Sequence, residues 1–313
     1  MSSTPKALGM FPGQGSQRAG MAEFLLSHYP EAAGRVFDIA DRTLGFSLTE
    51  LCVSGSATEI GCTEIAQPAI VATSLAILEV LSEKGFRLSL VTGHSLGEYT
   101  ALVAAGVLEP GDAFGLVRRR GELMARVSDR VSGAMVAIFG LPVEVVEAIC
   151  AGLRADGVAE VANHNEAGQT VISGTRDAVA RAARIALGYG AERVVELDVS
   201  APFHCSLMHE IEGEFAAELD RYDFAPPRLP VLSSVTGEPV TTAEEAKWLL
   251  RCQLAGPVRW VDVLTAAQRH GITDYVEIGP GRVLSGLANR MVSGASVRST
   301  NDKRRVAALL QTY

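Results

Sequence analysis

The sequence contains few cysteines, and their spacing fits neither a disulfide framework nor a metal site. There are five of them, an odd number, scattered along 313 residues with no C-x-x-C pair. This distribution is typical of reduced thiols in a cytoplasmic enzyme and argues against zinc. We therefore expect no bound metal and a cytoplasmic location.

An excess of positive charge and a long apolar run are also missing. The formal net charge is -8, which argues against nucleic acid as a partner. No uninterrupted apolar run reaches membrane-spanning length, and residues 1–6 lack the apolar core of a signal peptide. With 48% hydrophobic and 20% charged residues, the chain is able to bury a large core. We expect a folded protein that binds neither nucleic acid nor membranes.

A serine flanked by glycines stands between a predicted strand and a predicted helix. Residues 93–97 read Gly-His-Ser-Leu-Gly, with the strand expected at 88–92 and the helix at 98–105. In that context, G-x-S-x-G exposes the Ser95 hydroxyl at the strand end, and the helix N-terminus offers N–H groups to an oxyanion. The alternative is an ordinary strand-to-helix turn with a solvated serine, and the flanking elements favour the nucleophile.

A second glycine-containing loop follows the first predicted strand. The strand is expected at 7–11, and residues 12–17 read Pro-Gly-Gln-Gly-Ser-Gln. The third glycine of a dinucleotide-binding fingerprint is missing. We interpret the segment as a tight loop that lines a pocket.

Two helices are expected on either side of the serine motif. The first, at 69–81, is apolar almost all round, with Pro68 in its first turn. The second, at 110–127, carries Arg120 on its apolar stripe. A buried guanidinium needs a partner. Periodicity alone favours a carboxylate within the protein, such as Glu98, over a carboxylate on the substrate.

The middle of the chain has the element order of a separate small domain. Residues 130–199 are predicted to follow the order β-α-β-β-α-β, which is typical of a ferredoxin-like unit. Strands and helices alternate in the flanking parts, 1–129 and 200–313, which argues for a mostly parallel sheet. We predict an α/β fold with a small domain inserted between the two halves of a large catalytic domain.

A serine nucleophile needs a base, and the sequence offers six histidines. Two lie in surface-like helical contexts, and His94 is too constrained within the serine motif to serve its own neighbour. Of the remaining His164, His204 and His209, His204 is preferred. It follows the small domain, near the carboxyl ends of the strands, where loops gather around a site.

Together these motifs resemble the malonyl-CoA:acyl-carrier-protein transacylase family, the acyltransferases of fatty acid and polyketide synthesis. The matching stretches are 11–17, 67–69, 93–99, 120–121, 133–135, 163–174, 204–205, 253–254, 257–260 and 277–281. The resemblance implies an α/β-hydrolase-like large domain with a ferredoxin-like insertion. It also implies ping-pong transfer of a malonyl group from malonyl-CoA to the phosphopantetheine thiol of an acyl carrier protein, with no bound cofactor.

The resemblance also implies roles for individual residues. Ser95 would be the nucleophile and His204 the general base, whose ring donates to the main-chain carbonyl of Gln253 in place of a triad aspartate. The main-chain N–H groups of Gln14 and Leu96 would form the oxyanion hole. Arg120 would bind the malonyl carboxylate, which reverses the preference drawn from periodicity. Further substrate contacts would come from Gln67, His94, Asn163 and Phe203.

One position before the histidine bears on the acyl group and on the pathway. Malonyl-type polyketide acyltransferases tend to carry phenylalanine at the position of Phe203, whereas fatty-acid-type members often carry serine. A phenyl ring there would disfavour one extra methyl group by about 1–3 kcal/mol. Glu166, in a loop that lacks the usual proline, would disfavour a nearby anionic acyl group, so we expect this loop either to lie away from the acyl group or to serve a different one. Malonyl is the leading substrate, another acyl group is the alternative, and Phe203 favours a polyketide pathway.

Two alternative functions from other classes are also compatible with much of this sequence. An editing thioester hydrolase would pass the acyl group to water, and Arg120 argues against it. A non-catalytic subunit that binds carrier proteins would not need an intact Ser95 and His204. Basic side chains are expected to meet the acidic carrier protein, and the candidates are Arg193, Arg282, Arg290, Arg298, Lys303, Arg304 and Arg305.

Overall fold

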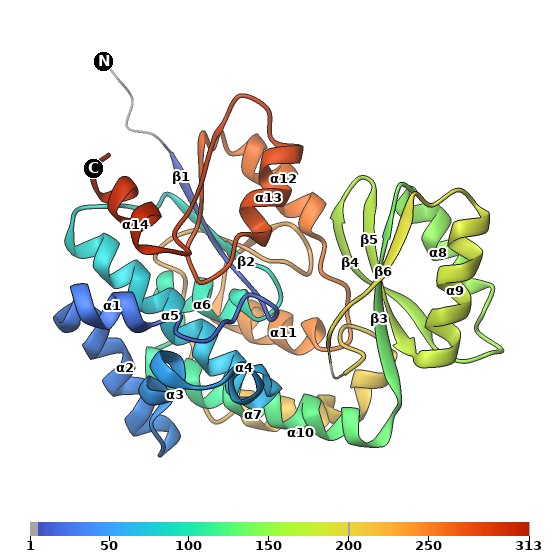
Figure 1. Ribbon diagram of the computed structural model, residues 1–313, viewed down its shortest axis with the longest axis horizontal. Coiled ribbons are helices and arrows are strands. Elements are labelled where there is room, and N and C mark those ends of the chain that lie inside the picture. The colour runs from blue at the N-terminus through green and yellow to red at the C-terminus, as the bar shows by residue number, and fades with distance from the viewer. Residues whose placement is uncertain (1–5, 200, 313) are drawn as a thin grey trace.

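The computed structural model describes residues 6–199 and 201–312. Within these residues the chain forms two sheets, which Figure 1 shows side by side. The larger has six strands in the order β10-β9-β1-β2-β7-β8, and the smaller has four in the order β4-β5-β3-β6. This is an α/β fold with one mostly parallel and one antiparallel sheet, as the element order predicts.

The larger sheet brings the two glycine-containing loops together. Every neighbouring pair of its strands is parallel except β7 with β8. Phe11, the last residue of β1, pairs with Gly93, the last residue of β2. The loop after β1 and the serine motif after β2 therefore start side by side. The strands are β1 (Ala7–Phe11), β2 (Leu90–Gly93), β7 (Val231–Leu232), β8 (Pro239–Val240), β9 (Asp274–Glu277) and β10 (Ser296–Ser299).

Helices cover both faces of this sheet, because its strands present apolar side chains to both. In β1, Leu8 and Met10 pack with α12 and α13, whereas Phe11 belongs to the core that includes α5, α6 and α7 (Figure 1). The helices are α1 (Glu23–His28), α2 (Pro30–Leu44), α3 (Leu48–Ser54), α4 (Ala57–Gly61), α5 (Thr63–Glu83), α6 (Gly97–Ala104), α7 (Pro110–Arg130), α10 (His209–Leu219), α11 (Ala243–Gln253), α12 (Trp260–Arg269), α13 (Val283–Met291) and α14 (Lys303–Leu310). A 3-10 turn, Ser206–Met208, precedes α10.

Helix α5 begins earlier than its sequence suggests. A start at Pro68 is wrong, because α5 begins at Thr63 and carries Pro68 inside it. Proline has no N–H to donate to the carbonyl four residues back. That carbonyl, of Glu64, accepts a hydrogen bond from Arg118 Nη1 at 3.0 Å instead. The helix is long and apolar enough to cross a membrane, but 78% of its apolar window is buried inside the protein, as in a core helix.

The smaller sheet is built by the β-α-β-β-α-β segment. All its strand pairs are antiparallel. In β3, Ala134, Val136 and Ile138 pack beneath α8 and α9, whereas Met135 and Ala137 belong to the core of the large sheet. One face of the small sheet therefore turns toward the large one (Figure 1). The elements are β3 (Gly133–Phe139), α8 (Val143–Ala151), β4 (Ala159–Glu166), β5 (Gln169–Thr175), α9 (Arg176–Gly188) and β6 (Arg193–Glu196).

Strand β4 also bonds to the segment that leads into α12. Val258 donates its N–H to the carbonyl of Ala162, and His164 donates to the carbonyl of Val258, both at 2.8 Å. These bonds tie the small sheet to the large part of the chain. The domain limits at 129/130 and 199/200 remain a prediction, and Ser200 lies outside the described residues.

Candidate active site

Ser95 sits on a turn that its two flanking glycines make sterically possible. A Cβ on Gly93 would lie 1.9 Å from the carbonyl carbon of Gly97, and a Cβ on Gly97 would lie 2.0 Å from the carbonyl oxygen of Phe11. No side chain fits at either position. Ser95 itself has φ +52°, in the left-handed region that serine rarely adopts. The tight contacts on both sides hold the hydroxyl in this strained orientation.

The imidazole of His204 lies directly beside that hydroxyl. His204 Nε2 is 2.6 Å from Ser95 Oγ, and the ring is buried with 4% of the residue exposed. Its other nitrogen, Nδ1, lies 2.9 Å from the carbonyl oxygen of Gln253 and 3.1 Å from that of Gly256. Both neighbours of Nδ1 accept hydrogen bonds, so Nδ1 carries the ring proton. Nε2 is then free to accept the proton of Ser95.

The surroundings keep this imidazole neutral. Burial is the main cause and the positive charge of Arg120 the second, and together they lower the pKa of His204 from 6.5 to about 3. Carbonyl contacts at Nδ1 oppose the shift. At neutral pH the ring is therefore able to accept a proton.

Arg120 reaches the same hydroxyl from the other side. Its guanidinium is buried and donates from Nη2 to Ser95 Oγ at 3.2 Å and to Gln253 Oε1 at 3.2 Å. Nη1 donates to Gln67 Oε1 at 3.0 Å, and the group lies 5.6 Å from the centroid of the Tyr99 ring. These acceptors are all uncharged. The buried cation therefore stands beside Ser95 with no carboxylate bonded directly to it in the described structure.

The direct pairing of Arg120 with Glu98, which periodicity favours, is wrong. Glu98 Oε2 accepts instead from Ser234 Oγ and from Gln253 Nε2, both at 2.6 Å. The Gln253 side chain thus lies between Glu98 and Arg120. This arrangement leaves the guanidinium open toward Ser95.

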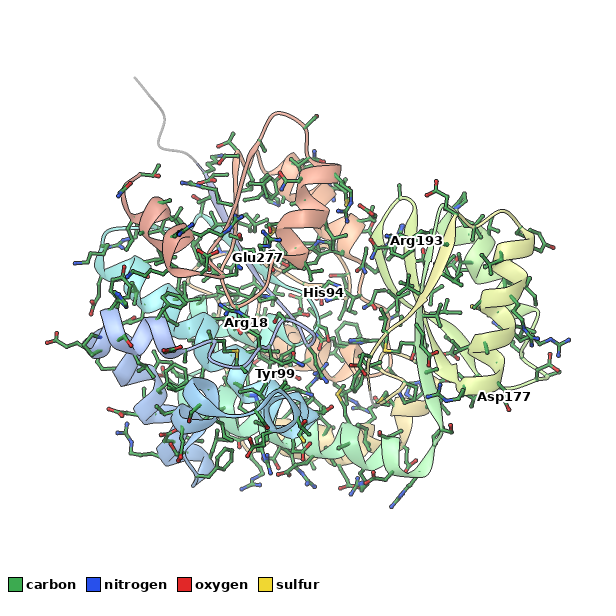
Figure 2. The ribbon with its side chains drawn as sticks, viewed as in Figure 1. Arg18, His94, Tyr99, Asp177, Arg193 and Glu277 are labelled. Atoms are coloured by element: carbon green, nitrogen blue, oxygen red, sulfur yellow. The ribbon has the colours of Figure 1, made fainter. Side chains whose placement is uncertain are left out.

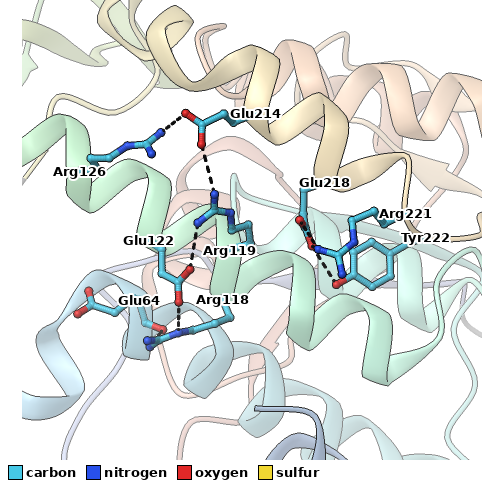
Figure 3. A network of polar contacts seen from close by, with 9 residues as sticks. All are labelled: Glu64, Arg118, Arg119, Glu122, Arg126, Glu214, Glu218, Arg221 and Tyr222. Carbon is cyan, nitrogen blue, oxygen red and sulfur yellow. Dashed lines mark hydrogen bonds and ion pairs between the residues drawn. The ribbon is translucent and has the colours of Figure 1, made fainter. Parts of the chain in front are cut away.

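The opposite side of α7 is held by ion pairs, shown in Figure 3. Arg118 Nε lies 2.8 Å from Glu122, and Arg119 and Arg126 both pair with Glu214 of α10, at 3.3 Å and 2.5 Å. Each partly exposed pair contributes little to stability. Their direction nevertheless shows that the neighbours of Arg120 in the sequence point away from the site.

A cleft of about 230 Å³ opens above Ser95 and His204, between the two sheets. The small sheet supplies apolar side chains, among them Met135, Ala137 and Val171, and the loop after β1 supplies the opposite wall. Phe203, Asn163, His94 and Gln14 all line it. In Figure 2, His94 lies at the junction of the two parts of the molecule. The serine motif, the loop after β1 and His204 therefore meet in one cavity, whereas Arg120 and Gln253 lie behind Ser95 and do not line it.

Two main-chain N–H groups lie close to Ser95, because Leu96 directly follows the serine and Gln14 lines the cleft above it. Leu96 precedes the first residue of α6, and Gln14 lies in the loop after β1, with its side-chain amide donating to Thr63 Oγ1 at 3.1 Å. Neither main-chain N–H donates to another residue of the described structure. Both are therefore available to an oxygen bound above Ser95, as the oxyanion-hole hypothesis requires.

His94 helps to shape the wall of the cleft. Its Nε2 lies 2.9 Å from Asn165 Oδ1, and its ring centroid is 5.4 Å from that of Trp260. Burial lowers the pKa of His94, so this ring too is neutral. Sequence reasoning missed Asn165, although it follows Asn163 by two positions in a strand, which places alternate residues on one face.

Gln67 and Glu166 both lie outside the lining of the cleft. Gln67 is buried behind Arg120, where its Nε2 donates to Met124 Sδ, and it does not line the cleft. Glu166 pairs with Arg290 Nε at 2.6 Å. Its charge is thereby offset, and the repulsion expected toward an anionic acyl group is weakened.

The basic residues expected at a carrier-protein surface are largely engaged with their own chain. Arg298 pairs with Asp274, Arg305 pairs with Asp302, and the Arg193 guanidinium lies 4.0 Å from the centroid of the Phe139 ring. Their role in docking remains a prediction. Across the described residues, no three His, Cys, Asp or Glu side chains gather in a group that could hold a metal ion.

Comparison with known proteins places this geometry among acyltransferases. Residues 10–307 match the family described as acyl transferase domain. The malonyl CoA-acyl carrier protein transacylase of Bacillus subtilis (strain 168) is 40% identical over 304 residues, covering 97% of this chain and 96% of that protein. The protein of the same name from Escherichia coli (strain K12) is 36% identical over 303 residues, covering 96% and 98%.

Solved structures agree in fold as well as in sequence. A malonyl-transacylase in complex with its type II PKS acyl-carrier protein superposes with a TM-score of 0.95 at 38% identity, covering 98% of this chain and 100% of that one. An acyl carrier protein S-malonyltransferase from Vibrio cholerae O1 biovar eltor gives 0.93 at 37% identity, covering 97% and 99%. The similarity therefore extends over both sheets and the cleft between them.

Proposed function

This chain belongs to the acyl transferase domain family, and we propose that it transfers malonyl groups from malonyl-CoA to an acyl carrier protein through an ester on Ser95. One observation carries the proposal. The Ser95 hydroxyl lies 2.6 Å from a neutral imidazole and 3.2 Å from a buried guanidinium. The first contact suits a nucleophile, and the second suits an acyl group that ends in a carboxylate.

In the first half-reaction the acyl group moves from coenzyme A to the protein. Ser95 Oγ attacks the thioester carbonyl carbon while His204 Nε2 takes the hydroxyl proton. The carbonyl oxygen becomes an oxyanion, which the N–H groups of Gln14 and Leu96 stabilise, each worth about 2.7–4 kcal/mol for a typical donor. The C–S bond then breaks, and the thiolate of coenzyme A takes the proton from the imidazolium. The products are a malonyl ester on Ser95 and free coenzyme A.

The second half-reaction repeats these steps with a different thiol. His204 takes the proton of the phosphopantetheine thiol on the carrier protein, and the sulfur attacks the ester carbonyl of Ser95. When the C–O bond breaks, the imidazolium returns its proton to Ser95 Oγ. The acyl group has moved from one thioester to another, and Ser95 and His204 are regenerated. The scheme needs no resident cofactor, since both thiols belong to the substrates.

Arg120 gives the reaction its preference for a free carboxylate. A planar guanidinium binds a carboxylate with two parallel hydrogen bonds, and a buried one does so in a site with little competing water. The bound carboxylate also neutralises a charge that is costly to bury alone. Phe203 lines the cleft above Ser95 and is placed to crowd a substituent on the α-carbon.

The proposal also covers the acceptor, the pathway and the cellular location. The relative solved with a type II PKS carrier protein supports a carrier protein as the acceptor, and Phe203 favours a polyketide over a fatty acid pathway. All five cysteines are free thiols, which is typical of a reducing compartment, and we place the protein in the cytoplasm.

Intact-protein mass spectrometry tests the function. The protein is mixed briefly with malonyl-, methylmalonyl- and acetyl-CoA in turn, with Ser95→Ala as control. A malonyl adduct found in the natural protein and missing from Ser95→Ala supports the proposal. Preferential loading of the acetyl group overturns the role of Arg120, preferential loading of the methylmalonyl group overturns the role of Phe203, and no adduct from any donor overturns the role of Ser95. The loaded protein is then kept in buffer or mixed with carrier protein. Equal rates of adduct loss in these two samples identify a thioester hydrolase.

A further inference from the structure

The buried carboxyl group of Glu98 takes no part in the reaction scheme above. Glu98 lies in the first turn of α6, three positions after Ser95, and only 1% of it is exposed. A carboxyl group is costly to bury, so its contacts must satisfy it. Burial raises the pKa of Glu98, and hydrogen bonds from Ser234 and Gln253 oppose this shift.

The contact with Gln253 fixes which way that side-chain amide points. Gln253 Nε2 donates to Glu98 Oε2 at 2.6 Å and to the main-chain oxygen of Ser95 at 3.0 Å, and Oε1 accepts from Arg120 at 3.2 Å. A guanidinium only donates hydrogen bonds, so the amide oxygen must face Arg120 and the amide nitrogen must face Glu98. The flipped amide would lose all three hydrogen bonds.

Gln253 contacts all three of Ser95, His204 and Arg120. Its side-chain oxygen holds Arg120, its side-chain nitrogen holds the turn at Ser95, and its main-chain oxygen lies 2.9 Å from His204 Nδ1. Glu98 contacts the Gln253 side chain, and neither of these two residues is among those that line the cleft.

We propose that Glu98 is a positioning residue for acyl groups that carry a free carboxylate. By holding the Gln253 amide in one orientation, it aims the Arg120 guanidinium at the space beside Ser95. The inference rests on the proposed function, because Arg120 is the group that would meet the malonyl carboxylate. Loss of Glu98 should therefore harm a carboxylated acyl donor more than one without a carboxylate.

The test compares two donors in the same protein preparation. The rate constant of Ser95 acylation is measured by rapid-quench mass spectrometry with malonyl-CoA and with acetyl-CoA, for Glu98→Ala and Glu98→Gln. Misplacement of a binding group by about 1 Å costs up to ~100-fold, and we expect the malonyl-to-acetyl ratio to fall at least about tenfold in Glu98→Ala. Glu98→Gln retains an oxygen for Gln253 Nε2 and should restore the ratio to within about threefold of the natural protein.

A double-mutant cycle shows whether Glu98 acts through Gln253. In a Gln253→Ala background, Glu98→Ala should change the ratio by less than about twofold, because the residue that connects it to Arg120 is gone. Glu122→Ala is the matched control, since Glu122 contacts the neighbouring Arg118 and Arg119 on the outer side of α7. It should leave the ratio unchanged.

Three results would overturn the inference. They are an unchanged ratio in Glu98→Ala, an equal loss with both donors, or a tenfold change that persists without Gln253. The ratio compares two donors within one preparation, so a partly folded variant does not distort it. Glu98→Gln provides a second variant in which the same ratio is measured. If the natural protein loads no malonyl group, the proposed function fails, and the role of Glu98 fails with it.

Discussion

Ser95 and His204 face each other with the same unusual backbone conformation. Among residues 6–199 and 201–312 they are the two residues other than glycine with positive φ, +52° and +58°, and their side chains meet at 2.6 Å. Left-handed backbone costs a residue with a side chain about 1–2 kcal/mol. The strain lies on both members of the proposed pair, and tight packing around Gly93 and Gly97 holds the turn at Ser95.

Removal of this strain should stabilise the protein. Glycine adopts the left-handed region freely, so Ser95→Gly should be more stable than Ser95→Ala by about 1 kcal/mol in urea unfolding, with both variants inactive. At Ala180, an exposed residue in the middle of helix α9, glycine should instead be less stable than alanine, by about 1 kcal/mol. If Ser95→Ala is as stable as Ser95→Gly, position 95 is not strained.

The lowered pKa of His204 should extend activity to acidic pH. Acylation needs the neutral imidazole, and burial with the nearby Arg120 charge lowers its pKa from 6.5 to about 3. We therefore expect kcat/KM for Ser95 acylation, which reports the free enzyme, to stay level from about pH 8 to about pH 5. Stopped acylation reactions followed by mass spectrometry measure it, and circular dichroism at each pH checks folding. A decline governed by a pKa near 6.5 would show that the imidazole is not shielded.

Arg120 should decide between acyl groups with and without a carboxylate. A hydrogen bond to a charged group contributes about 1.5–3 kcal/mol, so Arg120→Ala should lower malonyl loading relative to acetyl loading by at least about tenfold. Arg120→Lys lacks the planar pair of donors, so its ratio of malonyl to acetyl loading should lie between those of the natural protein and Arg120→Ala. Arg119→Ala, on the outer side of α7, is the control. Equal losses with both donors would assign Arg120 a structural role instead.

Phe203 should limit the size of the substituent on the α-carbon. Its ring lines the cleft, and replacement by serine should make room for one methyl group. Phe203→Ser is expected to raise methylmalonyl loading relative to malonyl loading by about tenfold or more, since such a contact is worth about 1–3 kcal/mol. Competition between the two CoA esters measures this ratio directly. If the ratio does not change, the selectivity resides elsewhere in the cleft.

The sequence predicts the parts of the site that local patterns determine. The glycines around Ser95, the loop after β1 and the order of elements in the small sheet are local, and the structure has them in those places. The start of α5 escaped prediction because the donor that replaces the missing proline N–H comes from Arg118, fifty-four positions away from Glu64 in sequence.

The contacts that orient the site escaped prediction for the same reason. Periodicity identified Arg120 as buried, yet its link to Glu98 runs through Gln253, which is 133 positions from Arg120. Asn165 reaches His94 across 71 positions. Strand β10 is a four-residue edge strand fixed by its pairing with β9, whereas helix α12 was missed although Trp260, Val263, Leu264 and Ala267 recur at helical spacing.

The central claim is that Ser95 carries a malonyl group on its way to a carrier thiol. Malonyl-loaded protein, freed of malonyl-CoA, is divided among buffer, a carrier protein without phosphopantetheine, and the same carrier protein with it. We predict that the adduct persists in the first two samples and disappears in the third, where the carrier protein gains the same mass. Equal decay in all three samples, with no gain on the carrier protein, would contradict the account.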